Sequence, residues 1–223
     1  MGNGAATPQT CPITATWLGW SGAVVGQGRA GWSKFADRYD WLMSFRFLTG
    51  KLLVSPPWAD DQNFTRSVVL VLAHSPDGAF GVVLNDESTT GVDTIADVVG
   101  PAWAALLAPP ESIFVGGPCQ TSSVIALGMI NQNNGQSEVQ WEVTVVDLNQ
   151  DRPRPEITRI RLFAGYAGWA PLQLESELDR GGWFVATASP EDSLTDEPDE
   201  LWQRIMSRNG DPYARIPTDP RLN

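Results

Sequence analysis

The segment Gly165–Trp183 constrains the fold more than any other part of this chain. It combines glycines at both ends with tryptophans, a proline and a short apolar periodicity. Glycine lets backbone approach backbone in a tight turn, and proline is favoured in the first turn of a helix. We therefore predict a glycine turn at Gly165, a helix that begins at Pro171, and an end to that helix at Gly181 in the left-handed conformation common at such positions.

Short apolar segments separated by turn residues occupy most of the chain beyond residue 50. Ser67–Ala73 and Arg159–Phe163 have the composition and alternation of strands, and helical periodicity is clear at Glu197–Arg208. Strands that follow one another through turns, with few helices, are typical of an α+β protein. We predict a single domain with a largely antiparallel sheet, in an open or barrel-like form, flanked by short helices.

Residues 1–49 form an extension before this domain, which spans residues 50–223. Apolar side chains recur at helical spacing over residues 32–45, which predicts an amphipathic helix. Its aromatic stripe is too apolar to be left in water. We expect it to pack against the domain or against a second copy of the chain, giving a homo-oligomer through residues 32–45. The stripe comprises Trp32, Phe35, Tyr39, Leu42 and Met43.

The charge of the chain is strongly negative and unevenly distributed. Its 223 residues carry a formal net charge of −11, and the acidic excess lies in the domain after residue 50. Nucleic-acid binding depends on Lys and Arg side chains that neutralise phosphates. Direct nucleic-acid binding is therefore disfavoured.

The cysteine count and the hydropathy indicate the expected compartment. Cys11 and Cys119 are the two cysteines, too few for a disulfide framework, so a reducing cytoplasm is the simplest location. No segment reaches the roughly 18 apolar residues of a membrane span, so we expect no membrane association. The N-terminal segment also lacks the basic start of a secretory signal.

Several blocks in this order resemble the YqgE/AlgH family of bacterial proteins, over about residues 50–223. The resemblance implies a fold and little function, because family members are mostly uncharacterised and some carry the label of transcriptional regulator. The blocks that carry it are Gly50–Pro57, Asp60, Asp61 and Phe64, Arg66–His74, Asp77–Asn85, Ile113–Pro118, Gly165–Trp183 and Asp219–Asn223.

His74 is the single histidine of the chain. It ends a predicted buried strand before a turn, where a ligand-facing group or a hydrogen-bonded turn residue is common. It matches the histidine at the corresponding point of the family motif. One histidine does not make a metal site of the usual kind, and Gly116-Gly117-Pro118 lacks the spacing of a phosphate loop. We expect neither a metal nor a cofactor.

Gln173 and Glu177 are four residues apart and share a face of the predicted helix. In a cleft walled by Tyr166 and Trp169 they could act as a general base and its orienting partner. Alternatively, Glu177 caps backbone groups or pairs with Arg180. The candidate ligand-binding residues are His74, Tyr166, Trp169, Gln173 and Glu177.

Three functional hypotheses follow. The favoured one is a cytosolic, non-enzymatic regulatory protein that binds a protein partner or a small ligand. A DNA-binding regulator would need the one basic cluster, on a predicted hairpin edge, as its phosphate-facing surface. A hydrolase or transferase would need His74, Gln173 and Glu177 to line one cleft. The cluster comprises Arg152, Arg154, Arg159 and Arg161.

Overall fold

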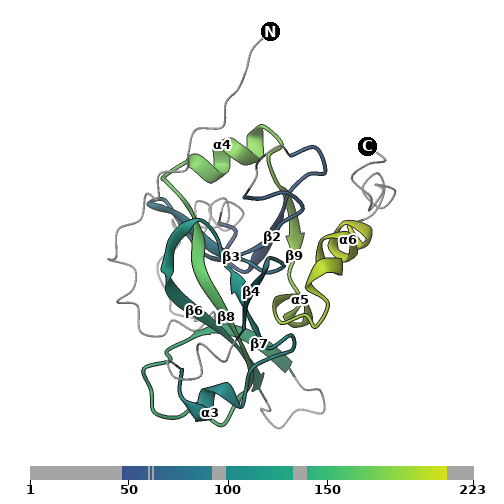
Figure 1. The fold of residues 1–223 in the computed structure, drawn as a ribbon. Helices are drawn as coiled ribbons and strands as arrows, with labels where there is room; N and C mark the ends of the chain where they lie inside the picture. The colour runs from purple at the N-terminus through teal and green to yellow at the C-terminus, as the bar shows by residue number, and fades with distance from the viewer. Residues whose placement is uncertain (1–46, 60, 62, 92–98, 133–139, 210–223) are drawn as a thin grey trace.

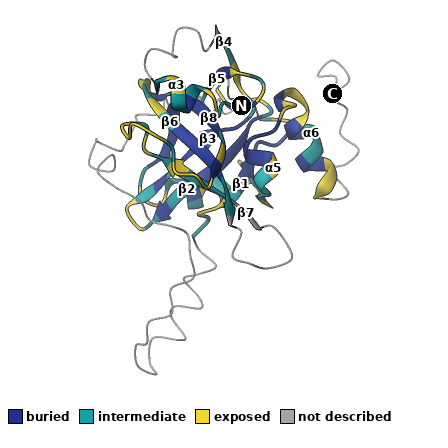
Figure 2. Cartoon of the chain, turned by 90° about the horizontal axis from the view of Figure 1, so that it is seen from below, coloured by how far each residue is buried: buried dark blue, intermediate teal, exposed yellow. Residues whose placement is uncertain are grey.

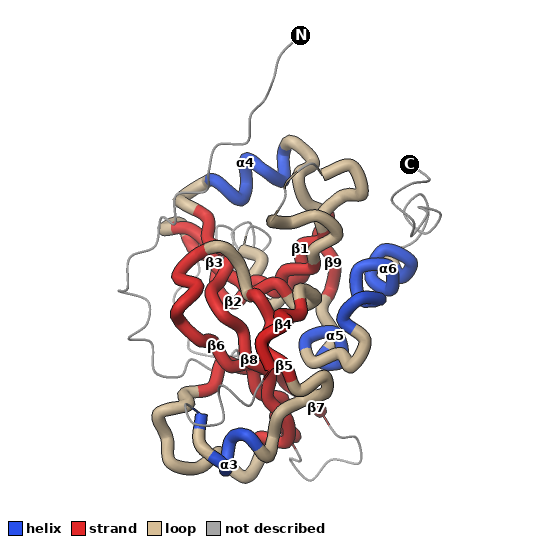
Figure 3. Tube along the Cα trace, in the orientation of Figure 1, coloured by secondary structure: helices blue, strands red, loops and turns tan. Residues whose placement is uncertain are grey.

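A computed structural model describes residues 47–59, 61, 63–91, 99–132 and 140–209. The predicted helix at residues 32–45 lies outside these residues, as do Cys11 and the block at residues 219–223. Within the described residues the chain is a single α+β domain whose strands form the centre and whose helices lie at the periphery (Figure 3).

Nine strands of the described residues form one curled sheet (Figure 1). The main path through it runs β4-β5-β8-β3-β2-β1-β9, and β6 pairs with β8 and with β7. The strands are β1 (Lys51–Val54), β2 (Val68–Ser75), β3 (Gly78–Val83), β4 (Glu87–Gly91), β5 (Ser112–Val115), β6 (Cys119–Gln132), β7 (Gln140–Val146), β8 (Ile157–Trp169) and β9 (Phe184–Thr187).

The sheet is mixed, so the prediction of a largely antiparallel sheet was wrong. Strand β8 pairs with both β5 and β6, antiparallel to β6 but parallel to β5. Strand β4, which the sequence pattern did not predict, pairs with β5 at the end of the path. The parallel pair was missed because residues 112–115 and 157–169 are separated by the whole β6–β7 hairpin.

Strand β8 joins two parts of the sheet, one made of β4, β5, β6 and β7 and the other of β1, β2, β3 and β9. Its first half pairs with β5 and β6, and its last residues, Ala167–Trp169, pair with β3. The predicted glycine turn at Gly165 is therefore wrong: Gly165 has a φ of 72° but lies within the strand. Its absent side chain leaves room for another backbone, since a Cβ there would lie 2.5 Å from the Gly117 carbonyl oxygen.

Gly116 and Gly117 lie on the other side of this close approach, between β5 and β6. A Cβ on Gly116 would lie 2.3 Å from the carbonyl oxygen of Gly165, and one on Gly117 would lie 2.4 Å from the carbonyl carbon of Tyr166. Real atoms do not approach so closely, so this backbone contact requires glycine. The pair acts in backbone packing, as expected for a segment without the spacing of a phosphate loop.

Helices cover the sheet on its two faces and at one end (Figures 1 and 2). The buried faces of α6 (Pro198–Arg208) join the core cluster that draws residues from both parts of the sheet. Helix α4 (Gln173–Asp179) places Leu174 in a second cluster on the opposite face, and α3 (Pro101–Ala104) places Trp103 in a third. Helix α5 (Pro190–Ser193) precedes α6.

The helix boundaries differ from the predicted ones at α4. Pro171 and Leu172 precede the helix, and Leu172 has a φ of 62° and is 70% exposed, so it does not share the buried side of Leu174. Gly181 follows the helix with a φ of 72°, as predicted. Helix α6 closely matches the predicted Glu197–Arg208.

Cys119 begins β6 and is completely buried. It is disulfide-bonded. In the described part of the chain, no helix has the length and apolar character that crossing a bilayer requires.

Candidate functional site

A β-bulge in β2 determines where His74 lies. The register of β2 against β3 shifts between Val71 and Ala73. The alternation of side chains between the two faces is therefore displaced by one residue, and His74 pairs with Ala79. Ala79 in turn lies opposite Trp169 of β8 and belongs to the core cluster under α4. Directly paired residues share a face of a sheet. The bulge therefore puts His74 on the same face as Trp169, beneath α4.

Both ring nitrogens of His74 have partners. Nδ1 accepts a hydrogen bond from the Leu48 backbone N–H at 3.1 Å, which leaves the proton of a neutral ring on Nε2. Nε2 lies 3.2 Å from Glu175 Oε1, so it donates to that carboxylate. The imidazole is buried, with its side chain 1% exposed, and Phe47 packs against it edge-on. His74 thus ties α4 and residues 47–48 to the end of β2.

The Glu177 carboxylate accepts three hydrogen bonds from side chains. Oε2 accepts from the indole N–H of Trp169 at 2.9 Å and of Trp183 at 2.8 Å. Oε1 accepts from Gln173 Nε2 at 2.9 Å, and Gln173 Oε1 accepts the Ala170 backbone N–H. A carboxylate satisfied in this way holds two large buried aromatic rings against α4.

The cleft predicted around Gly165–Glu177 is not formed as expected. Tyr166 and Trp169 are three residues apart in a strand, so their side chains lie on opposite faces. Tyr166 belongs to the core cluster on the α6 side, next to Phe80, and burial raises the pKa of its phenol. His74 contacts Glu175, a residue that sequence reasoning missed, and the hydrogen bonds of Glu177 go to Trp169, Trp183 and Gln173. Ligand binding by the five predicted residues stays a prediction.

The predicted cluster of four arginines is also divided. Arg161 is buried, donates to the carbonyl oxygens of Thr195 and Pro109, and lies with its guanidinium carbon 4.4 Å from the centre of the Phe114 ring. Burial lowers its pKa to about 10. Arg159 pairs with Asp196 at 2.6 Å. Arg152 and Arg154 are exposed, so two of the four remain as an open basic surface.

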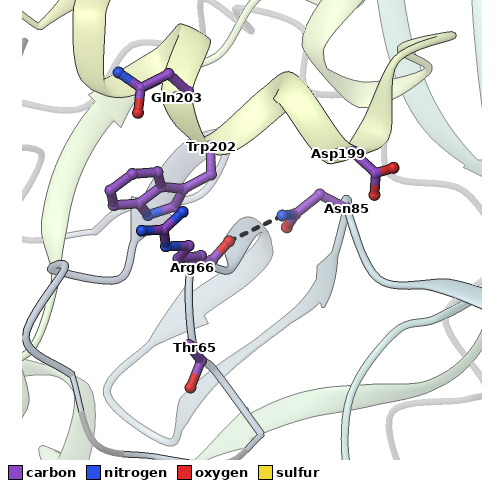
Figure 4. A pocket seen from close by; sticks show the side chains of 6 residues that line it. All are labelled: Thr65, Arg66, Asn85, Asp199, Trp202 and Gln203. Atoms are coloured by element: carbon purple, nitrogen blue, oxygen red, sulfur yellow. Dashed lines mark hydrogen bonds between the residues drawn. The ribbon is translucent and has the colours of Figure 1, made fainter. Parts of the chain in front are cut away.

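A polar pocket lies at the opposite end of β2 from His74. It has a volume of about 330 Å³, within the usual range for small-molecule sites. Its walls come from the loop before β2, the end of β3 and helix α6 (Figure 4). The lining residues are Thr65, Arg66, Asn85, Asp199, Trp202 and Gln203.

Arg66 is held in an unusual conformation on one wall of this pocket. Its φ is 52°, in the left-handed region that residues other than glycine rarely occupy. Its carbonyl oxygen accepts from Asn85 Nδ2 at 2.9 Å, while Asn85 Oδ1 accepts the Val68 backbone N–H at 2.8 Å. Asn85, two residues beyond the end of β3, thus fixes the backbone of Arg66.

The Trp202 ring forms the floor beneath the Arg66 guanidinium. The guanidinium carbon lies 5.2 Å from the ring centre, in the range of a cation–π contact. Trp202 is buried, and its indole N–H donates to the Ser55 carbonyl oxygen at 2.9 Å. The fold therefore positions both the cationic group and the ring.

Sequence reasoning missed this pocket because its walls come from three distant segments. Residues 65–66, 85 and 199–203 share no local motif, and α6 alone has the pattern of an ordinary amphipathic helix. Asn85 was the one signal available, since an amide at a strand end often fixes a neighbouring backbone. Among the described residues, no group of three or more His, Cys, Asp or Glu side chains is placed to hold a metal ion.

Fold and site together define a class of protein: a small α+β domain with a curled mixed sheet, a helix against each face, and a polar pocket between β2 and the last helix. A family model described as AlgH-like matches residues 52–214, and the chain belongs to this family. The resemblance to the YqgE/AlgH family is therefore confirmed.

Similar proteins support the same family assignment. A UPF0301 protein of Streptomyces coelicolor is 36% identical over 188 residues, which cover 79% of this chain and 95% of that protein. The crystal structure of protein DIP2367 from Corynebacterium diphtheriae matches with a TM-score of 0.66 and 31% identity, covering 75% of this chain and 90% of that one. The names of these proteins describe no activity.

The solution structure of the AlgH protein from Pseudomonas aeruginosa is a more distant match. Its TM-score is 0.54 at 23% identity, over 74% of this chain and 89% of that chain. This likeness concerns the fold.

Proposed function

We propose that this protein is a non-enzymatic ligand-binding protein and that its site is the pocket of Arg66, Asn85 and Trp202. The observation that carries this proposal is the conformation of Arg66. A left-handed φ costs a residue with a side chain about 1–2 kcal/mol, and such strain in folded proteins gathers at functional sites. Here the strained residue points a guanidinium along the wall of a cavity large enough for a small molecule.

The other candidate groups already have hydrogen-bond partners within the protein, which supports a binding role over a catalytic one. A general base needs a lone pair available to the substrate. The Glu177 carboxylate already accepts from three side chains, and both nitrogens of His74 are used by Leu48 and Glu175. These groups act in the attachment of α4.

A regulator that binds DNA directly is a weaker hypothesis. The charge balance is acidic, and Arg161 and Arg159 are withdrawn from the predicted basic surface by burial and by Asp196. If the protein regulates, these features favour action through its ligand or a protein partner.

The proposal is tested by screening polar metabolites against the intact protein. The readouts are the NMR resonances of the Asn85 side-chain amide and the Trp202 indole, followed by calorimetric titration. The library includes free amino acids in one arm and nucleotides, sugars, sugar phosphates and organic acids in the other.

Arg66→Gly is the informative variant, because it removes the guanidinium while glycine accommodates a φ of 52°. We expect this variant to stay folded and to lose ligand binding at least tenfold. Arg152→Gly, which removes an exposed charge outside the pocket, is the matched control and should bind normally. Binding that is unchanged in Arg66→Gly would contradict the proposal.

A further inference from the structure

Strand β9 is an edge of the sheet with an open side. It pairs with β1 and with no other strand of the described residues (Figure 3). Proteins commonly guard such edges with charged side chains, which keep foreign strands away. The two other edge strands follow this rule, since β4 begins with Glu87 and β7 contains Glu142. Strand β9 has the sequence Phe-Val-Ala-Thr and carries no charge.

The hydrogen-bond pattern of β1 shows which groups of β9 point outward. The Ser55 N–H donates to the Ser67 carbonyl oxygen, in register with the pairing of β1 and β2. Alternate residues of a strand in an antiparallel sheet bond to opposite neighbours, so Leu52 and Val54 direct their N–H and C=O groups toward β9. Val185 lies between their two partners in β9, and its own N–H and C=O groups therefore point away from the sheet.

A contact from helix α6 supports this direction. Thr187 lies two residues after Val185 and also points outward, and its carbonyl oxygen accepts a hydrogen bond from Arg208 Nη2 at 2.8 Å. The N–H group of Thr187 and both main-chain groups of Val185 have no hydrogen-bond partner among the described residues, and the same holds for Trp183 at the start of β9. Open main-chain groups thus follow one edge from Trp183 to Thr187, with Val185 at their centre.

These open groups are complementary to a second copy of themselves. When two β9 strands pair antiparallel about a two-fold axis at Val185, the N–H group of each Val185 meets the C=O group of the other. In the same register the Thr187 N–H of one strand meets the Trp183 carbonyl oxygen of the other. Each of these bonds uses groups that have no partner among the described residues of a single chain.

Apolar side chains flank the open edge on both faces of the sheet. Val185 is 44% exposed on one face. On the other face Trp58, which is 67% exposed, packs edge-on against Phe184 at a ring-centre distance of 5.8 Å. Exposed apolar groups beside an open strand edge mark an association surface. Because the chain carries a net charge of −11, two copies repel each other over most of their surface, and this uncharged strip allows contact at low electrostatic cost.

We propose that the β9 edge binds a second copy of this chain, so that the sheets of two protomers join through an antiparallel pair of β9 strands. Strand addition supplies the missing main-chain hydrogen bonds, and the packing of Val185 against its counterpart adds apolar contact. This surface differs from residues 32–45, through which the sequence predicts an oligomer, and it does not depend on the ligand pocket.

Analytical ultracentrifugation of the full chain, from about 10 µM to about 1 mM, measures the dimer. Val185→Lys places two like charges opposite each other at the centre of the contact, so we expect it to raise the Kd of dimerisation at least about tenfold. Val145→Lys is the matched control, because Val145 is a valine of similar exposure, 51%, on the edge strand β7. It should leave the Kd unchanged.

Two further measurements test the register of the strand pair. An equimolar mixture of Val185→Lys and Val185→Glu should form a mixed dimer more stable than either homodimer, because opposite charges then face each other across the two-fold axis. In the wild type, exchange of the Val185 amide hydrogen should slow as the protein concentration rises through the Kd, since that amide is bonded in the dimer alone.

The outcomes are distinct. A chain that is monomeric at about 1 mM overturns the proposal. A dimer with the same Kd in Val185→Lys as in the wild type also overturns it, and places the contact on another surface such as residues 32–45. If Val145→Lys weakens the dimer and Val185→Lys does not, the β7 edge is the interface instead. Should Val185→Lys fail to fold, the wild type decides, because Val185 amide exchange that does not change with concentration contradicts the proposal.

Discussion

Replacing Glu177 by alanine should destabilise the protein strongly, although the side chain lies on the surface helix α4. The change removes the acceptor of two buried indole N–H groups and of Gln173 Nε2. Trp169 is completely buried and Trp183 is 7% exposed, so neither indole can turn to bulk water without opening the core. Their rings also pack edge-to-face at a centroid distance of 6.1 Å, so a shift of one disturbs the other.

The expected cost follows from these contacts. Each hydrogen bond to a charged acceptor contributes about 1.5–3 kcal/mol. Two indole donors left unpaired therefore cost about 3–6 kcal/mol, and entry of water beside α4 places the result near the lower end. For a domain of this size, a loss of about 3–4 kcal/mol corresponds to a melting temperature lower by roughly 6–15 °C.

Urea unfolding followed by tryptophan fluorescence measures this cost, since the probes are the affected side chains. Glu175→Ala is the matched control, two residues away in the same short helix, with the same change in helix propensity and charge. Its carboxylate is one-third exposed and bonds only to His74 in the described structure, so its loss should cost about 1 kcal/mol. Equal costs for the two variants would refute the assignment of Glu177 as the anchor of α4.

Two further variants test the core. Gly116→Ala should destabilise by about 3 kcal/mol or more, at or above the top of the usual range for overpacking, because its Cβ would lie 2.3 Å from the Gly165 carbonyl oxygen. Gly50→Ala, with a φ of 78° but open space, should cost only about 1–2 kcal/mol, and similar melting temperatures for the two variants would contradict the close approach. For Arg161, burial lowers the pKa to about 10, so the folded protein holds this proton less tightly than the unfolded chain. The wild type should therefore gain stability relative to Arg161→Met as the pH rises through about 10, and a gap between their urea midpoints that does not change between about pH 9 and 11 would refute this.

Two strand segments and helix α6 were predicted well because their signals are local. Residues 67–73 and 159–163 have the apolar or alternating pattern of strands, and α6 has a clear helical period. The family resemblance also follows from ordered local blocks, and it is confirmed.

The errors arose where one part of the chain depends on a distant part. Gly165 and Gly168 indicate a turn when their segment is considered alone, but they lie in β8 because Gly116, Gly117 and Cys119 approach it from elsewhere in the sheet. The partner of His74 depends on a bulge in β2, which no sequence pattern marked. The pocket depends on three segments that meet only in the folded domain.

The position of β8 in the chain has a consequence for synthesis. Strands β1 to β3 are made first, but the edge of β3 stays unpaired until residues 167–169 have been added. The β6–β7 hairpin likewise waits for β8 before it joins the rest of the sheet. A nascent chain that has passed residue 150 therefore holds two incomplete pieces with open strand edges, which are the surfaces prone to aggregation and to capture by chaperones. Translation speed across residues 157–169 should then influence the yield of this protein more than speed elsewhere in the domain.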